Sequence, residues 1–184
     1  MTTNRRFCRF SKSPRTAAFS ITEIPEAGLC LSSFLILTEA RRPMEVLMGH
    51  MNPEAAWDHI GALDPDRVQA HSRGWMLPSS HLIFRESPEE AAHRIAREQL
   101  ELPDLTLSGP QVVSEVYTPK RFPGTADHWD IEFLFRGKIA ASDVVPAAAW
   151  RELAFVDVRR TSKSEIARSH EDVLESAGFQ FGGG

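Results

Sequence analysis

Blocks of apolar and polar residues along the chain predict strands on both sides of one amphipathic helix. The apolar run at 29–38 (LCLSSFLILT) predicts a buried strand. The charged stretch at 39–43 interrupts it, and 45–49 (EVLMG) predicts a returning strand, so that the two form a hairpin. Further along, 75–77 and 81–84 each predict a brief strand.

The helix predicted over 88–101 has the strongest signals in the sequence. Ser87 can accept a hydrogen bond from an early backbone N–H, Pro88 suits the first helical position, and Glu90 completes a capping box. Pro103 lies just beyond the predicted end of the helix. One face is apolar at helical spacing and is expected to face a core; it carries Ala91, Ala92, Ile95, Ala96 and Leu100.

Three more strands and a terminal helix are predicted after this helix. The strands are expected over 111–117, 128–135 and 153–158. The terminal helix is expected over 164–177, where Gly178 can end it. Strands, a central helix, more strands and a terminal helix together predict an α/β or α+β fold, a sandwich in which helices cover a mixed sheet.

Length and composition are typical of one globular domain. The chain has 184 residues, of which 42% are hydrophobic and 25% charged, so we expect one domain over 27–178 and a flexible tail over 179–184. No apolar run approaches the ~20 residues of a membrane-spanning helix, so we expect no membrane association and a cytoplasmic protein. The formal net charge of −4 disfavours nucleic acid as a partner, because nucleic-acid binders usually carry a basic stripe.

The first 26 residues differ in composition from the rest. They are basic and contain no acidic residue before Glu23. Such a segment is typical of a disordered basic tail or of a transit peptide, and we expect a tail over 1–26. Cys8 and Cys30 lack the spacing of a metal-binding motif, so both are expected to be reduced thiols.

The stretch at 74–102 combines a turn and the capped helix in a way that suits metal binding. Glu90, Arg94 and Glu98 are four residues apart and therefore share one helix face. A loop followed by a helix with acids at fixed offsets presents carboxylates to a divalent metal. The alternative interpretation is a solvent-exposed row of ion pairs, each stabilising the helix by about 0.2–0.5 kcal/mol.

The same stretch resembles a Nudix box, the signature of enzymes that hydrolyse nucleoside diphosphate derivatives. The box reads G-x5-E-x7-R-E-U-x-E-E-x-G-U, where U is a bulky aliphatic residue. Aligned without a gap, Glu86, Arg94 and Glu98 fall on its first glutamate, its arginine and its next-to-last glutamate. Ser80 falls on its first glycine, and the preceding 75–78 (WMLP) is similar to the family's usual lead into the box.

The resemblance extends over about 27–177, because a strand pair precedes the box and strands with a terminal helix follow it. It implies a Nudix-like α/β/α sandwich around a mixed sheet, a Mg²⁺ cofactor with Mn²⁺ as a substitute, and a small nucleotide-type substrate. It also implies a structural ion pair between Glu86 and Arg94. Homodimers are common in the family, which leaves a homodimer open here.

Several residues of the box are replaced. Ser79 and Ser80 stand in place of the usual glycine pair, where a backbone carbonyl often contacts metal. Ile95 replaces the glutamate after the arginine, and Gln99 replaces the last glutamate. The resemblance therefore implies Glu98 as a metal ligand, with Gln99 as a neutral oxygen donor beside it. Mg²⁺ commonly takes only one or two carboxylates and draws its other oxygens from phosphates and water, so this reduced set can hold one ion.

One branch of the family, the GDP-mannose mannosyl hydrolases, also lacks the glutamate after the arginine and binds a single Mg²⁺. The segment 94–102 (RIAREQLEL) resembles their box, although Glu101 stands where the Nudix box has its last glycine. The segment 122–125 (FPGT) is similar to a loop of that group. Their late Gln-His pair supplies a metal ligand and the base, and it aligns with Ala149 and Trp150 here.

Two histidines are candidates for a general base. His81 directly follows the serine pair, and His128 follows a basic loop. Each is expected to reach a water near Glu98, and the pKa of histidine suits proton transfer near neutrality. The alternative for each is a structural histidine. Lys120 and Arg121 on the basic loop are candidates for phosphate binding, or are ordinary surface cations.

These features predict a Nudix-type, Mg²⁺-dependent hydrolase that acts on a nucleoside diphosphate linked to another group, with a nucleotide sugar as one option. The alternative is a catalytically inactive Nudix-fold module that binds a nucleotide or a protein partner. Convergence of Glu98, Gln99 and a histidine beside the serine pair would favour the enzyme. An ion pair that ties Glu98 to Arg94 would disfavour it.

Overall fold

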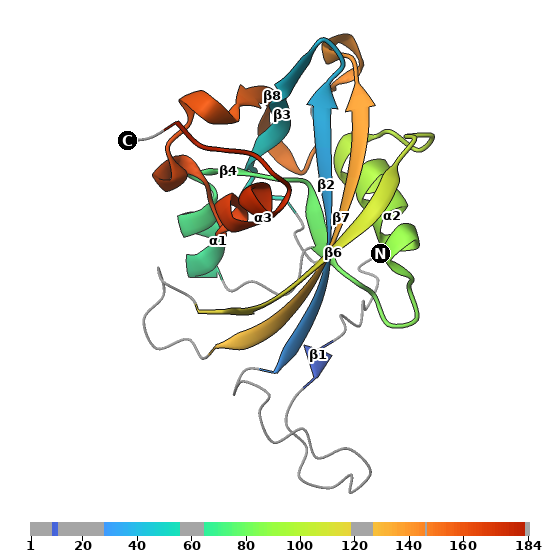
Figure 1. Ribbon diagram of the computed structural model, residues 1–184, viewed down its shortest axis with the longest axis vertical. Coiled ribbons are helices and arrows are strands. Elements are labelled where there is room, and N and C mark those ends of the chain that lie inside the picture. The colour runs from blue at the N-terminus through green and yellow to red at the C-terminus, as the bar shows by residue number, and fades with distance from the viewer. Residues whose placement is uncertain (1–8, 11–27, 56–64, 119–126, 146, 183–184) are drawn as a thin grey trace, which may run out of the picture.

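One mixed sheet with helices on both faces forms the body of the protein (Figure 1). The computed structural model describes residues 9–10, 28–55, 65–118, 127–145 and 147–182. In these residues the sheet has eight strands, and its main path runs β4-β3-β2-β7-β6. The predicted fold class, helices packed on a mixed sheet, is confirmed.

Two long parallel strands form the centre of the sheet. β2 (Leu29–Glu39) and β7 (His128–Ile139) pair in parallel along their whole length. β6 (Ser108–Tyr117) adds to β7 as an antiparallel neighbour. Every predicted strand in this group is present, because the alternation of apolar and polar residues matches the two faces of a pleated strand.

The predicted hairpin is also present. β3 (Arg42–Met51) returns from β2 and pairs with it near the turn. Further along, β3 pairs with β8 (Trp150–Asp157) and with β4 (Trp75–Met76). The divergence of β3 from β2 leaves the first half of β2 to pair with the short strand β5 (Ser79–His81).

β5 lies two residues before the strand predicted at 81–84. The reason is a turn: the backbone N–H of Glu86 donates to the carbonyl of Ile83 at 2.9 Å, and Arg85 has a left-handed φ of 73°. Phe84, expected inside a strand, is 60% exposed at this turn.

The central helix α2 (Pro88–Leu100) begins as predicted. The Ser87 hydroxyl accepts from the Glu90 backbone N–H at 3.1 Å, and the Glu90 carboxylate accepts from the Ser87 N–H at 2.8 Å. The helix ends at Glu101, which takes a left-handed conformation with φ of 57° and whose backbone N–H caps the Ala96 carbonyl. The end is therefore set by this cap, before Pro103 is reached.

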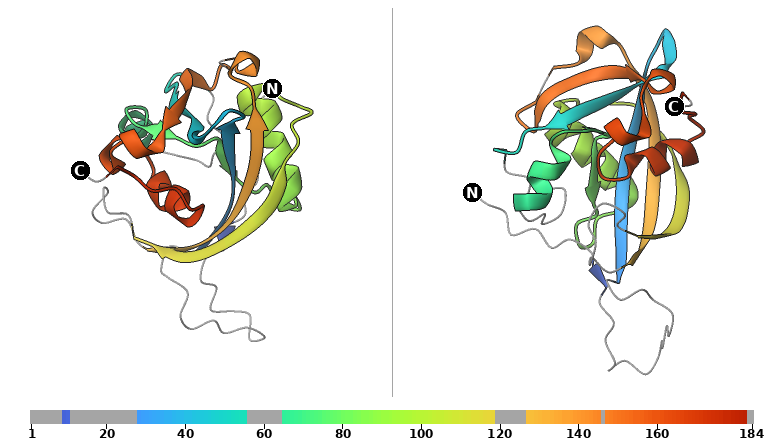
Figure 2. Two further views of the ribbon diagram at one scale, coloured as in Figure 1. Left: turned by 45° about the horizontal axis from the view of Figure 1, so that its top comes forward. Right: turned by 90° about the vertical axis from the view of Figure 1, so that its left-hand side faces the viewer.

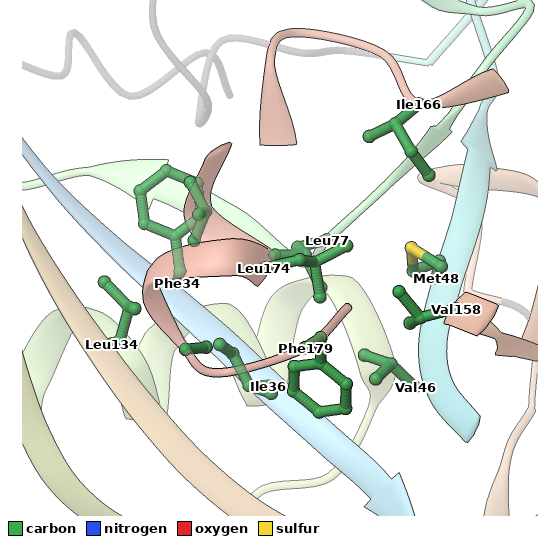
Figure 3. Packing of buried hydrophobic residues seen from close by; sticks show 12 residues of the cluster. Phe34, Ile36, Val46, Met48, Leu77, Leu134, Val158, Ile166, Leu174 and Phe179 are labelled. Carbon is green, nitrogen blue, oxygen red and sulfur yellow. The ribbon is translucent and has the colours of Figure 1, made fainter. Parts of the chain in front are cut away.

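Alternate residues of β2 face different helices. Leu35 and Leu37 pack with the apolar face of α2, including Ile95. Phe34 and Ile36 face the other side, where α3 (His170–Ser176) and the residues after it cover the sheet. Figure 2 shows α2 and α3 on opposite sides of the central strands, and Figure 3 shows the cluster on the α3 side.

The terminal helix predicted over 164–177 is shorter than expected. A single 3₁₀ turn spans Lys163–Glu165, and α3 begins only at His170. Arg168 and Ser169 separate the two with left-handed φ values of 58° and 57°, a conformation that no α-helix can contain. The tail expected from residue 179 begins instead with Phe179, which is buried in the core (Figure 3).

Two further short elements complete the described structure. The short helix α1 (Pro65–His71) precedes β4 in the chain. β1 (Arg9–Phe10) pairs with Leu29 and Cys30 of β2, within the segment expected to be a disordered tail. No helix among the described residues is long and apolar enough to cross a membrane.

The left-handed residue at the end of α2 leads to a stability prediction. Replacing Glu101 by glycine removes the steric conflict of a Cβ in this conformation, so Glu101→Gly should raise the free energy of unfolding by about 0.5–1 kcal/mol. Urea unfolding measures the change. Glu89→Gly, at an exposed helical position, is the matched control and should lower stability by about 1 kcal/mol. Equal losses in both variants would show that the αL cap imposes no strain.

Candidate active site

Glu86 and Arg94 form a buried, bidentate ion pair that ties the loop before α2 to the helix. Arg94 Nε lies 2.6 Å from Glu86 Oε1 and Nη2 lies 2.8 Å from Oε2. The guanidinium also donates to Ser80 Oγ at 3.1 Å and to the His81 carbonyl at 3.0 Å. Parallel charge-assisted bonds of this kind fix geometry as well as contribute energy. The Nudix-like ion pair therefore holds β5, the loop and the helix as one unit.

Gln99 makes a second tie between α2 and β5. Its side chain is fully buried. The amide oxygen accepts from the Ser79 backbone N–H at 3.3 Å, and the amide nitrogen donates to the Ser79 carbonyl at 2.8 Å. Both polar ends of the amide are thus bonded to backbone. This arrangement makes Gln99 a positioning residue and not the open oxygen donor that the sequence predicts.

Glu98 lies in the last turn of α2, beside Gln99 in sequence but with its side chain in a different setting. It is 26% exposed, and its carboxylate lies 3.9 Å from the guanidinium of Arg97, which is itself 59% exposed. Arg94 pairs with Glu86 and not with Glu98. The Glu98–Arg94 ion pair that would have disfavoured an enzyme is therefore not formed. Glu98 keeps a carboxylate within reach of solvent at the end of the box.

The candidate base His81 lies on the opposite face of the sheet from α2. Ser33 donates to the Pro88 carbonyl of α2, so its neighbour Ser32 points away from that helix, and Ser32 Oγ lies 3.1 Å from His81 Nδ1. Burial lowers the pKa of His81 to about 4, and the nearby Arg168 guanidinium adds to the shift. The imidazole is consequently neutral at pH 7.

His128 lies on this same face at the start of β7. Its Nε2 is 3.2 Å from Asp130 Oδ2, and the ring of Tyr117 packs against the imidazole with centroids 5.0 Å apart. Tyr117 in turn shares a hydrogen bond of 3.1 Å with Ser169, just before α3. A carboxylate and an aromatic ring thus orient His128, which the sequence predicted only as a lone histidine.

Glu132 is a buried acid on the same face that the sequence analysis did not single out. It is 5% exposed, and its Oε2 has no hydrogen-bond partner among the described residues. Burial raises the pKa of Glu132 to about 8, and the nearby carboxylates of Asp130, Glu115 and Asp172 raise it further. The signal that could have found it is the alternation Asp130-Ile131-Glu132-Phe133, which places two acids on one face of a mostly buried strand.

The structure brings some of the predicted residues together and separates others. Ser80, Glu86 and Arg94 form one hydrogen-bonded unit, joined by Ser79 and Gln99. His81 and His128 lie near each other, across the sheet from the helix that carries Glu98. The expected convergence of Glu98, Gln99 and a histidine beside the serine pair is therefore not formed. The predicted phosphate-binding residues Lys120 and Arg121 lie outside the described residues.

Trp150 and His170 are structural in this fold. Trp150, which the sequence resemblance placed at the catalytic pair of the mannosyl hydrolases, is buried, and its indole N–H donates to the Gln99 carbonyl at 2.8 Å. His170 Nδ1 accepts from the Leu77 backbone N–H at 2.9 Å, and its ring meets Phe34 edge to face. Burial lowers the pKa of His170 well below its ordinary value, so it stays neutral in the core.

Breaking the buried ion pair should destabilise the protein strongly. Arg94→Met leaves the Glu86 carboxylate buried without its partner, at an expected cost of about 3–5 kcal/mol in the free energy of unfolding. The double variant Glu86→Gln/Arg94→Met removes the stranded charge and should recover part of that loss. Urea unfolding of the wild type, Arg94→Met, Glu86→Gln and the double variant measures the coupling. Additive losses would show that the two side chains do not act as a pair.

The raised pKa of Glu132 should make stability depend on pH. The folded protein holds this proton up to about pH 8, whereas the ordinary pKa is 4.5. The stabilisation from the raised pKa is therefore complete below pH 4.5 and is lost as pH rises through about 8. Glu132→Gln has no proton to lose, so its stability relative to wild type should grow by a few kcal/mol, in order of magnitude, between pH 5 and 9. Urea unfolding with EDTA present measures this difference, and a constant difference would contradict it.

Comparison with known proteins identifies the fold. No family profile and no curated protein matches the sequence. Among solved structures, the chain is similar to a MutT protein from Methanosarcina mazei Go1, with a TM-score of 0.54 and 14% identity over 80% of this chain and 91% of that chain. It is also similar to the Nudix domain of NrtR from Shewanella oneidensis complexed with ADP-ribose, with a TM-score of 0.53 and 12% identity over 82% of this chain and 87% of that chain.

A third similar structure contains a metal ion. It is a bifunctional NMN adenylyltransferase/ADP-ribose pyrophosphatase from Francisella tularensis complexed with AMP and a Mn ion, with a TM-score of 0.51 and 13% identity over 80% of this chain and 40% of that chain. The arrangement of strands and flanking helices is shared at these low identities, and the loop-helix unit lies where the Nudix box was expected. The chain therefore has the Nudix fold.

Proposed function

We propose that this protein is a Nudix-type hydrolase that uses a divalent cation to cleave a nucleoside diphosphate linked to another group. The observation that carries the proposal is the position of Glu98. The Glu86–Arg94 pair holds the loop and α2 in register, and Glu98 follows one helical turn later with its carboxylate 26% exposed. A preserved scaffold with an accessible acid at a ligand position is what a metal-dependent hydrolase of this fold requires.

The donor set suits one cation and not a cluster of several. Glu98 can supply one carboxylate oxygen, while Gln99 and the Ser79 carbonyl are bonded to each other. Mg²⁺ and Mn²⁺ prefer oxygen ligands, and Mg²⁺ usually keeps several waters and binds substrate phosphates in addition to one or two carboxylates. A bound cation would neutralise charge that develops on the diphosphate.

His81 is the base that we favour. Its depressed pKa keeps the imidazole unprotonated at neutral pH, which is the form that can accept a proton from water. His81 lies two residues after Ser79. The Ser79 backbone is bound by Gln99, which follows Glu98 in the helix. β5 is thus bound from the α2 side through the Ser79 backbone and carries His81 on the polar face, and we propose that the substrate lies along this strand. Lys120 and Arg121 remain candidates for holding its phosphates.

The ADP-ribose in the NrtR structure makes ADP-ribose the first substrate to test. A nucleotide sugar is the narrower option, since the box resembles that of the mannosyl hydrolases. Both share a diphosphate joined to a ribose or another sugar, and so both fit the proposed reaction class. A dinucleoside polyphosphate extends the panel to substrates without a free sugar.

Glu98→Gln should lower kcat/KM by about 10²-fold or more, because it removes the carboxylate that binds the cation without changing the shape of the side chain. The assay compares ADP-ribose, nucleotide sugars and dinucleoside polyphosphates, each with Mg²⁺, with Mn²⁺ and with EDTA. Glu89→Gln is the matched control, an exposed acid on the same helix, and it should retain wild-type activity.

Two outcomes would overturn parts of the proposal. Equal activity of wild type and Glu98→Gln would remove the assigned ligand. Absence of turnover by the wild-type protein with every substrate and cation would favour a non-catalytic Nudix-fold module, and isothermal titration with ADP-ribose would then measure whether it binds nucleotides.

A further inference from the structure

We propose that Cys30, His128 and Asp130 form a binding site for a divalent transition metal such as Zn²⁺, on the face of the sheet opposite α2. The site is separate from the cation site proposed at Glu98 and does not depend on hydrolase activity. The Cys sulfur, the His nitrogen and the Asp oxygen all lie within 4.8 Å of one another.

The strand register produces this cluster. β2 and β7 run in parallel with Cys30 directly beside Asp130, so their side chains emerge next to each other on one face. His128 lies two residues before Asp130 on the same strand and therefore points to the same side. Three ligand types that are far apart in sequence thus meet on two adjacent, rigid central strands.

The distances are close to those of a metal site. With bonds of about 2.0–2.3 Å, the ligand atoms of a tetrahedral Zn²⁺ site stand roughly 3.3–3.8 Å apart. The separation between His128 Nε2 and Asp130 Oδ2 is already 3.2 Å. The Cys30 sulfur lies within 4.8 Å of both atoms, so coordination requires only that it move closer.

The donor set selects the metal. A thiolate, an imidazole and a carboxylate suit Zn²⁺ and other borderline-soft ions, whereas Mg²⁺ prefers oxygen alone. Three protein ligands leave a fourth position for water or another ligand, as in catalytic zinc sites. Cys30 is 8% exposed and forms no disulfide in the described part of the chain, so its sulfur is a thiol shielded from bulk solvent.

The surroundings favour a cation, which is a second and independent observation. Next to Asp130 on the same face, the carboxyl of Glu132 is 5% exposed and leaves Oε2 without a hydrogen-bond partner. Asp130, Glu115 and Asp172 bring negative charge to this region, and Arg168 is the nearby cation. A bound dication would offset this concentration of carboxyl groups.

The imidazole is also held by an aromatic contact. The Tyr117 ring packs against His128, and the Tyr117 hydroxyl is bonded to Ser169 before α3. Such supporting contacts orient a ligand before the metal arrives. They also connect the site to the segment that covers this face, so metal binding should stabilise the packing of α3.

The test uses the full chain, purified with chelator, and Co²⁺ as a spectroscopic substitute for Zn²⁺. We expect one equivalent of Co²⁺ to bind and to give a thiolate-to-cobalt charge-transfer band in the near ultraviolet, which one equivalent of Zn²⁺ removes. Cys30→Ser should abolish the band, and His128→Gln or Asp130→Asn should weaken Zn²⁺ binding by about ten-fold or more. Zn²⁺ should also raise the Tm of the wild type.

Two matched controls separate this site from other sources of binding. Cys8→Ser, which changes the second cysteine of the sequence, should keep the charge-transfer band. Glu98→Gln, which disables the cation site of the proposed hydrolase, should keep it as well. Loss of hydrolysis in Glu98→Gln with the band intact would show that the two sites are distinct.

Several results would overturn the proposal. They are absence of the band in the wild type, its persistence in Cys30→Ser, or its loss in Cys8→Ser. Because the wild-type spectrum decides the first of these, the proposal stays testable even if a variant at the buried Cys30 fails to fold. Binding that millimolar Mg²⁺ displaces would also count against it, since Mg²⁺ competes poorly for a thiolate site.

Discussion

The ion pair between Glu86 and Arg94 is the interaction on which the rest of this structure depends. It is buried, bidentate and shared with Ser80 and the His81 carbonyl, so one guanidinium fixes the turn, the short strand β5 and the helix α2. Removing charge from water is costly, and such a pair stabilises only when its geometry and its additional hydrogen bonds are good. Here every arm of the guanidinium has an acceptor, which explains how the loop-helix unit persists although two of its acids are absent.

The pleat of the central strands divides the molecule into two chemically different halves. On the α2 side, apolar side chains of β2 and β7 pack against the helix, and Ser33 donates a hydrogen bond to the Pro88 carbonyl of α2. On the other side, the first halves of the same strands carry a thiol, a hydroxyl, a histidine and two acids before the apolar core begins at Phe34. The Nudix box accounts for the first half only. The second half contains most of the groups whose pKa values are strongly shifted.

Much of the fold could be predicted from sequence because local signals agree with tertiary packing. The capping box at Ser87 and the alternation in β2 and β7 are local patterns, and each is present. The terminal helix was predicted too long because left-handed residues at 168 and 169 leave no compositional mark. The strand predicted at 81–84 is displaced because the carboxylate of Glu86 accepts a hydrogen bond from the Ile83 backbone and turns the chain. The periodicity of apolar and polar residues carries no information about such a side-chain contact.

The site was less predictable for a different reason. Motif spacing located Glu86 and Arg94, whose roles follow from one contiguous segment. Cys30 and Asp130 are one hundred positions apart and become neighbours only through a parallel strand pair, which sequence spacing does not express. Gln99 shows the reverse limit: its position suggested a ligand, but burial and the Ser79 backbone decide its role.

That hydrogen-bonded pair between Gln99 and Ser79 also constrains what the sequence can become. An amide satisfies both the N–H and the carbonyl of Ser79, whereas a carboxylate at the same place can accept from the N–H but only repel the carbonyl. A return to the glutamate of the family signature by one substitution would bury a charge and weaken one of the two ties between β5 and the helix. Reversing this replacement alone is therefore costly, and a chain that regained the second acid would depend on Arg94 alone to hold β5 against the helix.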